Sequence, residues 1–182
     1  MRFRFNIEIT DKEYYDFNNF VAFRSKYGKK MLMLIHIICI IMLLLLVVVP
    51  LIEGKFQKDA LIGVIPGIIL VFIWFLLFKP FMKLITKLHL KLIGKNAKKL
   101  YSPSSVIEFF DDCFCETTHE NKNEHKYFAI ESVSVVEYKA VYIHINSMLG
   151  YIIPAYAFTS PSEYEEFLKF IKEKVTTVNY YK

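Results

Sequence analysis

Two long runs without charged side chains constrain this chain more than any other feature of its sequence. Residues 31–52 and residues 60–78 contain no Asp, Glu, Lys or Arg, and only residues 53–59 separate them. Because an α-helix rises about 1.5 Å per residue, each run is long enough to cross a hydrocarbon layer about 30 Å thick. The sequence therefore predicts a transmembrane helical hairpin over residues 31–80, which would leave both termini on the same side of a membrane.

Basic residues flank these two runs. Residues 1–30 carry seven Lys and Arg, residues 79–100 carry seven Lys and no acidic residue, and the linker carries two Lys. Cytoplasmic flanks of membrane helices are enriched in Lys and Arg. We accordingly expect an integral, multi-pass membrane protein with both termini in the cytoplasm.

The C-terminal part has the opposite charge. Residues 101–182 contain twelve Asp and Glu and seven Lys, so the sequence pI of about 8.9 comes from the flanks of the apolar runs. An acidic domain repels the phosphate backbone of nucleic acids. We therefore expect no nucleic-acid partner.

Residues 81–100 are predicted to form a basic amphipathic helix after the second run. Lys83, Lys87, Lys91 and Lys95 recur every four residues and so share one face of a helix. With Lys98 and Lys99 they would contact anionic lipid headgroups. The alternative is that they form the solvated face of a helix packed on the globular domain.

Gly63 and Gly67 are candidates for helix packing within the second run. Small residues four apart allow two membrane helices to approach closely, either within the hairpin or between copies in a homo-oligomer. The alternative is that Gly and Pro are simply frequent in membrane helices.

Residues 1–30 read as a strand followed by a helix. Apolar and polar residues alternate over residues 3–9, and Thr10 with Glu13 forms a capping box at a helix start. A single amphipathic strand needs partners. We expect these to come from the C-terminal domain, with which residues 1–30 would pack.

Residues 101–182 are predicted to form a β-rich domain with a C-terminal helix. Short apolar runs interrupted by turn residues predict antiparallel strands over residues 106–110, 113–118, 127–130, 133–138, 141–145 and 151–153, with a polar turn at 119–124. Ser160, Pro161 and Glu163 then start an amphipathic helix. The expected fold class is a two-helix transmembrane hairpin inserted in a small α+β domain with a curved antiparallel sheet.

With this layout, the chain resembles the YcxB-like family of bacterial membrane proteins. The resemblance is greatest in the tail, over residues 127–130, Val133, Glu137, Ile153, Pro154, Phe158, Glu163 and Phe167. It implies a cytoplasmic domain similar to a pleckstrin-homology (PH) fold, held at the membrane of a bacterial cell. It implies no catalytic residue.

One group of residues has the composition of a metal site. Cys113 and Cys115 are two apart, so their side chains would point to the same face of a strand, and His119 or His125 could approach them through a hairpin. Structural zinc sites more often have longer spacers in a turn, and cysteines are ordinary in a sheet. We therefore assign no metal ligand here and leave open whether the cysteines bind one.

No other set of residues predicts a reaction. The adjacent carboxylates Asp111–Asp112 and Glu165–Glu166 diverge from one another, and no glycine-rich phosphate loop or nucleophile motif is present. The sequence thus predicts no enzyme, no cofactor and no catalytic residue.

The expected function is that of a scaffold, adaptor or regulatory subunit with an unidentified protein partner. Its partner surface is expected among Tyr138, Tyr142, Tyr151 and Tyr156, because tyrosines suit both interfaces and cores. The alternative is a small oligomeric transport or bacteriocin-immunity-type membrane protein in which the hairpin is the working part.

Overall fold

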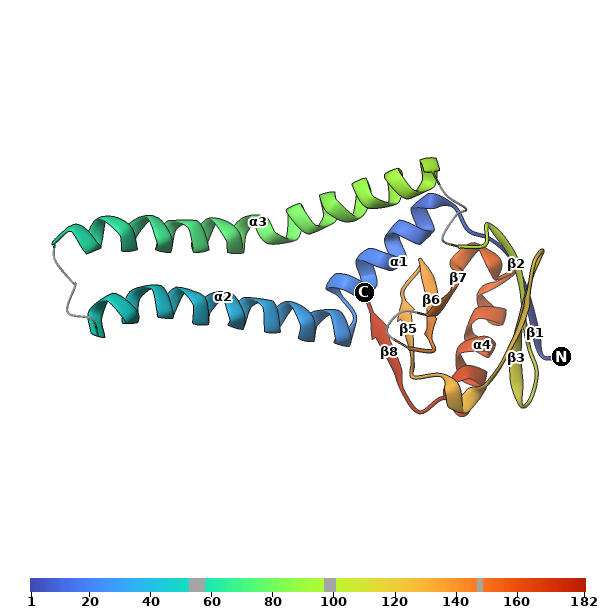
Figure 1. Ribbon diagram of the computed structural model, residues 1–182. Coiled ribbons are helices and arrows are strands. Elements are labelled where there is room, and N and C mark those ends of the chain that lie inside the picture. The colour runs from blue at the N-terminus through green and yellow to red at the C-terminus, as the bar shows by residue number, and fades with distance from the viewer. Residues whose placement is uncertain (53–57, 97–100, 147–148) are drawn as a thin grey trace. The chain divides into compact units, whose positions relative to one another are not determined.

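A computed structural model of the chain describes residues 1–52, 58–96, 101–146 and 149–182 (Figure 1). Within the long helices, the side chains of residues 43, 46–48, 50–52, 58–65, 67 and 89–96 lie outside this description. The chain divides into two compact units, one of Met1–Asn18 with Ile93–Lys182 and one of Asn19–Leu92. The first unit, which we call the sheet domain, holds all the strands described.

The first sheet of the sheet domain joins the N-terminus to the chain after residue 100. Its strands are β1 (Phe3–Glu8), β2 (Ser104–Phe109), β3 (Cys113–Thr118) and β4 (Lys122–Lys126), paired antiparallel in that order. β1 pairs with β2 over its whole length, from Phe3 opposite Phe109 to Glu8 opposite Ser104. The predicted N-terminal strand, and its pairing with a strand from beyond residue 100, are therefore confirmed.

The second sheet contains one parallel strand. Its order is β7 (Gly150–Pro154), β6 (Ala140–His144), β5 (Ser132–Val136) and β8 (Val178–Tyr181), and β8 lies parallel to β5. The prediction of a purely antiparallel sheet is wrong here. β8 follows the helix α4 (Pro161–Lys174), and a helical crossover returns the chain in the direction that makes a parallel pair.

The core of the sheet domain is a cluster of aromatic and β-branched side chains from both sheets and α4. Phe167 of α4 is fully buried and packs edge to face on Phe5 and Phe109, with ring centroids 5.1 and 5.0 Å apart. Phe5 alternates with exposed polar residues along β1, as the period-two pattern predicts. The N-terminal strand and the C-terminal helix therefore share one core.

Both predicted capping boxes begin helices. α1 (Asp11–Phe23) starts after Thr10, whose backbone N–H and hydroxyl both donate to the Glu13 carboxylate. α4 starts after Ser160, whose Oγ accepts from the Glu163 N–H at 3.1 Å. Each cap satisfies donors that the first helical turn leaves without partners.

The second unit contains two long helices, α2 (Lys26–Ile52) and α3 (Lys58–Asn96). They meet at His36 of α2, whose ring lies 4.6 Å from that of Phe75 and 5.4 Å from that of Phe78. α3 continues through Pro66 and Pro80, so the second apolar run and the predicted basic helix form one element.

The predicted two-span transmembrane hairpin is contradicted. Of the residues described, one helical segment, Ile68–Leu88, is long and apolar enough to cross a membrane, and no second one is found in α2. That segment overlaps the predicted second span over residues 68–78 and continues to Leu88. A hairpin needs two spans, so the predicted fold class of a membrane hairpin and the predicted multi-pass location with both termini in the cytoplasm are both wrong. The alternative function, that of a small oligomeric transport or bacteriocin-immunity-type protein, stays a prediction.

Two elements after residue 100 also differ from expectation. The predicted polar turn contains the start of β4, because strand pairing with β3 orders the polar residues Lys122–Lys126. The predicted strand at residues 127–130 is instead the 3-10 turn η1 (Tyr127–Ala129). A further 3-10 turn, η2 (Ala155–Ala157), connects β7 to the segment before α4.

Candidate functional site

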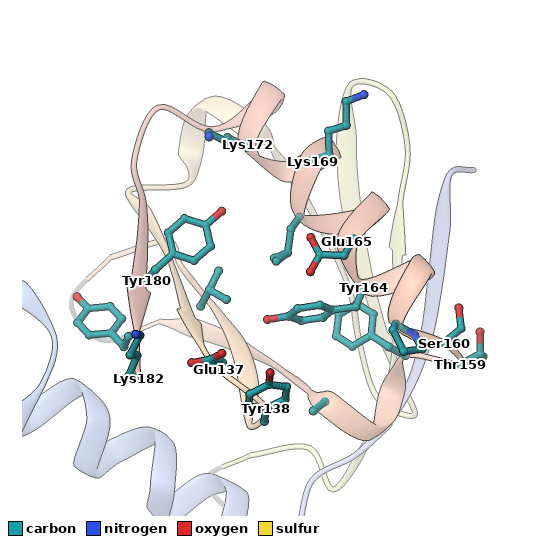
Figure 2. A pocket seen from close by; sticks show the side chains of 16 residues that line it. Glu137, Tyr138, Thr159, Ser160, Tyr164, Glu165, Lys169, Lys172, Tyr180 and Lys182 are labelled. Carbon is teal, nitrogen blue, oxygen red and sulfur yellow. The ribbon is translucent and has the colours of Figure 1, made fainter.

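The sheet domain has a groove between α4 and β8. Its volume is about 1020 Å³, and Figure 2 shows the side chains that line it. They come from β5 and the turn after it, η2, α4 and β8, and comprise Val135, Glu137, Tyr138, Ala155, Phe158, Thr159, Ser160, Pro161, Tyr164, Glu165, Leu168, Lys169, Lys172, Tyr180, Tyr181 and Lys182. We call this the α4–β8 groove.

The floor of the groove is apolar because it continues the domain core. Val135 on β5 is 3% exposed and Leu168 on α4 is 8% exposed. Phe158, just before α4, packs its ring on Phe5 and Phe167. The floor is therefore formed by residues of the buried core or in contact with it.

Tyrosine side chains line the rim of the groove around this floor. The side chain of Tyr138 is 88% exposed and that of Tyr180 is 60% exposed, whereas Tyr164 is half-buried against Phe158 at 5.0 Å between centroids. Figure 2 shows the rings of Tyr180 and Tyr164 on opposite sides of the groove, directed into the space between β8 and α4. An aromatic ring with a polar tip binds apolar ligand surface and keeps a hydrogen-bonding group at its end.

Tyr138 is held in an unusual backbone conformation. It lies in the turn between β5 and β6 with φ of 57°, the one described residue other than glycine with a positive φ. The turn is closed by the Lys139 N–H, which donates to the Val136 carbonyl at 3.0 Å. A bulky residue in the left-handed region costs about 1–2 kcal/mol. Backbone strain of this kind is often retained at functional sites, so the strained position and exposed ring of Tyr138 at the rim of the groove indicate a functional role for this side chain.

Charges are distributed unequally along the groove. In Figure 2, Lys169 and Lys172 stand at one end, and Glu137 lies near Tyr138 and Lys182 at the other. Glu165 lies between them on α4. The groove therefore presents a basic end and a mixed end.

The N-terminus of α4 is not a vacant anion site. The Glu163 carboxylate accepts hydrogen bonds from Thr159, at 2.6 Å from its backbone nitrogen and 2.7 Å from its hydroxyl. Because a negative charge of the chain itself already lies at this helix end, a bound phosphate would be repelled. Burial, and then nearby Glu165, raise the pKa of Tyr164, so its hydroxyl stays protonated and can donate.

The four tyrosines of the predicted partner surface differ in burial and do not form one surface. Tyr142 is 4% exposed and Tyr151 is 6% exposed, and both lie in the core. Tyr156 is 58% exposed and its hydroxyl donates to the Glu8 carbonyl. Tyr138 alone of the four lines the groove. Tyr164 and Tyr180 were not predicted from the sequence as site residues, the first because it belongs to the apolar face of a helix and the second because no strand was predicted at β8.

The other predicted site residues belong to α3 or follow it. Lys83 and Lys87 are exposed on α3, and their contact with anionic lipid stays a prediction. Lys91 and Lys95, together with Gly63 and Gly67, belong to α3, but their side-chain surroundings lie outside the described residues. Lys98 and Lys99 lie outside them altogether.

A second, smaller cavity of about 310 Å³ lies between the two sheets and has a more polar wall. Glu116 of β3 faces it, and the Asn123 side-chain amide donates to its carboxylate at 3.3 Å. Burial raises the pKa of Glu116. Tyr151 also lines this cavity. Its hydroxyl is hydrogen-bonded to Nε2 of His125 at 2.7 Å. Burial, and then the nearby Glu116, raise the pKa of Tyr151 to about 12.

The cysteines and histidines predicted as metal candidates separate into two groups. His125 points into the core, where it lies on Phe114 with ring centroids 5.3 Å apart, and His119 is exposed in the turn after β3. Cys113 and Cys115 share the opposite face of β3, away from His125. The structure therefore separates both histidines from the cysteines.

The fold and groove define an α+β domain of two four-stranded sheets and a helix, with a groove whose rim carries aromatic side chains. No known protein family, curated protein or solved structure matched the chain in comparisons. The resemblance to the YcxB-like family thus stays a prediction.

Proposed function

We propose that the sheet domain is a protein-interaction module that binds an extended peptide segment of a partner in the α4–β8 groove. The observation that carries the proposal is the pair of exposed tyrosine rings, Tyr138 and Tyr180, at the rim of an apolar groove of about 1020 Å³. Tyrosine is enriched at protein interfaces, and isolated domains seldom expose such rings beside an apolar hollow without a use.

The size of the groove favours a peptide over a small metabolite. Pockets for small molecules have volumes of about 300–1,000 Å³ and enclose most of the ligand. The volume of the α4–β8 groove, about 1020 Å³, lies just above that range, and its rim tyrosines Tyr138 and Tyr180 remain open to solvent. A segment of several residues can place apolar side chains on Val135 and Leu168 while its backbone remains in water.

The charges indicate the composition of that segment. Lys169 and Lys172 at one end would attract an acidic side chain, and Tyr138 and Tyr180 would bind apolar or proline side chains. We therefore propose an extended segment with apolar anchors and an acidic residue near the α4 lysines. The resemblance to a family with a PH-like domain also supports an adaptor or regulatory role.

The chemistry of the groove supports a binding role over catalysis. Its described lining contains Glu, Lys, Tyr, Ser and Thr, and no His or Cys that could act as a nucleophile or as a base near neutral pH. The hydroxyl of Ser160 caps α4 through the Glu163 N–H. We propose that the protein is not an enzyme.

A peptide-display selection tests this function. A library of random peptides is selected against the purified full-length chain, and enriched peptides are measured by fluorescence polarisation against the wild type, Tyr180→Ala, and the control Phe128→Ala. Phe128 is 89% exposed in η1 and does not line the groove, so it matches Tyr180 as a surface aromatic. We expect the enriched peptides to contain apolar and acidic residues. Their affinity for Tyr180→Ala should be about 10-fold or more lower than for the wild type, and their affinity for Phe128→Ala should be unchanged. Failure to enrich any peptide, or equal affinity for both variants, would contradict the proposal.

A further inference from the structure

A set of three metal-ligating side chains lies on the first sheet, on the face opposite its core. It consists of Cys113 and Cys115 of β3 and Glu124 of β4, whose ligand atoms all lie within 4.8 Å of one another. None of them lines the α4–β8 groove or the smaller cavity. The set is therefore independent of the proposed peptide site.

The strand register explains why these residues meet. Side chains two residues apart on a strand point to the same face, so Cys113 and Cys115 share the face opposite the buried Phe114. Cys115 lies directly across from Glu124 in the antiparallel pair β3–β4, and opposed residues have Cβ atoms about 4.5–5.5 Å apart. Two thiols and a carboxylate thus converge on this face of the sheet, where Cys115 is buried, Cys113 is partly exposed and Glu124 is exposed.

The spacing suits a tetrahedral ion with small side-chain movements. A zinc ion bound at ~2.3 Å to sulfur and ~2.1 Å to oxygen separates its ligand atoms by about 3.6 Å. The ligand atoms here are within 4.8 Å, and the Glu124 side chain is 55% exposed, so it can turn toward the sulfurs. The free thiols of Cys113 and Cys115 are held in place by the strand.

The surrounding charges suit a divalent cation bound by thiolates. Two thiolates and one carboxylate carry three negative charges, which a divalent ion lowers to one. The Lys126 ammonium lies 3.6 Å from the Glu124 carboxylate and opposite Cys113 in the register, so it offsets the remaining charge. Thiolate ligands favour zinc over the harder ions magnesium and calcium.

From this geometry we infer that Cys113, Cys115 and Glu124 form a binding site for Zn²⁺, with water in the fourth position. Three protein ligands with one open position distinguish such a site from the closed four-ligand sites of zinc fingers. The ion would join β3 to β4 at the end of the first sheet and stabilise the hairpin whose second strand is made of polar residues.

Metal titration of the untagged full-length chain tests this site. The protein is stripped with a chelator, kept reduced with a phosphine, and titrated with Cd²⁺, whose charge-transfer absorbance reports thiolate ligands. Zn²⁺ affinity is then measured by competition with a chromophoric chelator. The variants are Cys113→Ser, Cys115→Ser and Glu124→Gln, and the matched control is Cys39→Ser, which removes the third cysteine, in α2.

We expect a charge-transfer band in the wild type and in Cys39→Ser, and its loss or marked weakening in each of the other two cysteine variants. Glu124→Gln should keep the band but lower the Zn²⁺ affinity about 10-fold or more. Thermal unfolding in chelator, where every variant should unfold in one cooperative transition, checks that they fold; any lower unfolding temperature of Cys115→Ser reflects only the cost of burying its hydroxyl. Absence of the band in the wild type, its persistence in Cys113→Ser or Cys115→Ser, or an unchanged Zn²⁺ affinity in Glu124→Gln would overturn the assignment.

Discussion

The ring of Phe5 packs edge-on against the ring of Phe167, at 5.1 Å between centroids and 84° between planes. Phe5 lies on the first strand and Phe167 on the last helix, and both side chains are fully buried. The two ends of the chain are thus held together at the centre of the sheet domain, and the segment between β1 and β2 is a long insertion in that domain.

Phe5→Ala should strongly destabilise the sheet domain. Removing a buried phenylalanine leaves a cavity and typically costs about 3–5 kcal/mol. Chemical denaturation followed by circular dichroism would measure the loss. The control Phe128→Ala makes the same change at a side chain that is 89% exposed, and should leave the free energy of unfolding within about 0.5 kcal/mol of the wild type. Equal effects of the two changes would contradict the placement of β1 in the core.

Tyr138→Gly should stabilise the domain and weaken peptide binding at the same time. Glycine adopts a positive φ without the steric cost that tyrosine has at 57°, so we expect a gain of about 1 kcal/mol in the free energy of unfolding. The same change removes a groove-lining ring that is 88% exposed. Parallel denaturation and binding measurements check both effects. A gain in stability without loss of binding would show that the strain at Tyr138 has no connection with the groove.

Ser160→Ala should destabilise α4 by about 1 kcal/mol. The Ser160 hydroxyl accepts a hydrogen bond from the Glu163 N–H at the first turn, and alanine cannot replace it. Ser162→Ala, two residues further on, provides the control because its hydroxyl makes only a long 3.4 Å contact with the Glu166 carboxylate. Thermal unfolding of the two variants checks the prediction, and a loss in Ser162→Ala as large as that in Ser160→Ala would count against it.

Glu116 should make the stability of the domain depend on pH. Burial raises its pKa in the folded protein above its ordinary value of 4.5, so the folded state binds this proton more tightly than the unfolded state does. The contribution to stability is therefore complete below pH 4.5 and is lost as the pH rises through the raised folded value. Glu116→Gln should remove this decline and increase stability near pH 7, measured by denaturation over a pH series. Glu131→Gln, on an exposed residue, should leave the decline in place.

Local patterns predicted the elements that depend on near neighbours. The alternation in residues 3–9 predicted β1, and the boxes at Thr10–Glu13 and Ser160–Glu163 predicted the starts of α1 and α4. In each case the interactions that define the element join residues within one or two turns, or one face of a strand. Such patterns can be read without knowing the fold.

Elements that depend on distant partners were not predicted. β4 consists of polar residues and is a strand because it pairs with β3, and β8 exists because α4 returns the chain beside β5. The α4–β8 groove was missed for the same reason, since its two walls are separate until β8 is placed. Length and apolar composition alone predicted two membrane spans, whereas among the residues described one helical segment qualifies.

NMR can locate the site at which a selected peptide binds. A peptide from the display selection is titrated into the isotope-labelled full-length chain, and backbone amide NMR shifts are followed. We expect the largest shifts to map to Glu137, Tyr138, residues 158–172 and Tyr180 around the groove, and the titration midpoint to move to about 10-fold or more higher peptide concentration in Tyr180→Ala. Shifts concentrated on β1, on β2 or around Phe128, or an unchanged midpoint in Tyr180→Ala, would contradict the claim that the α4–β8 groove is the binding site.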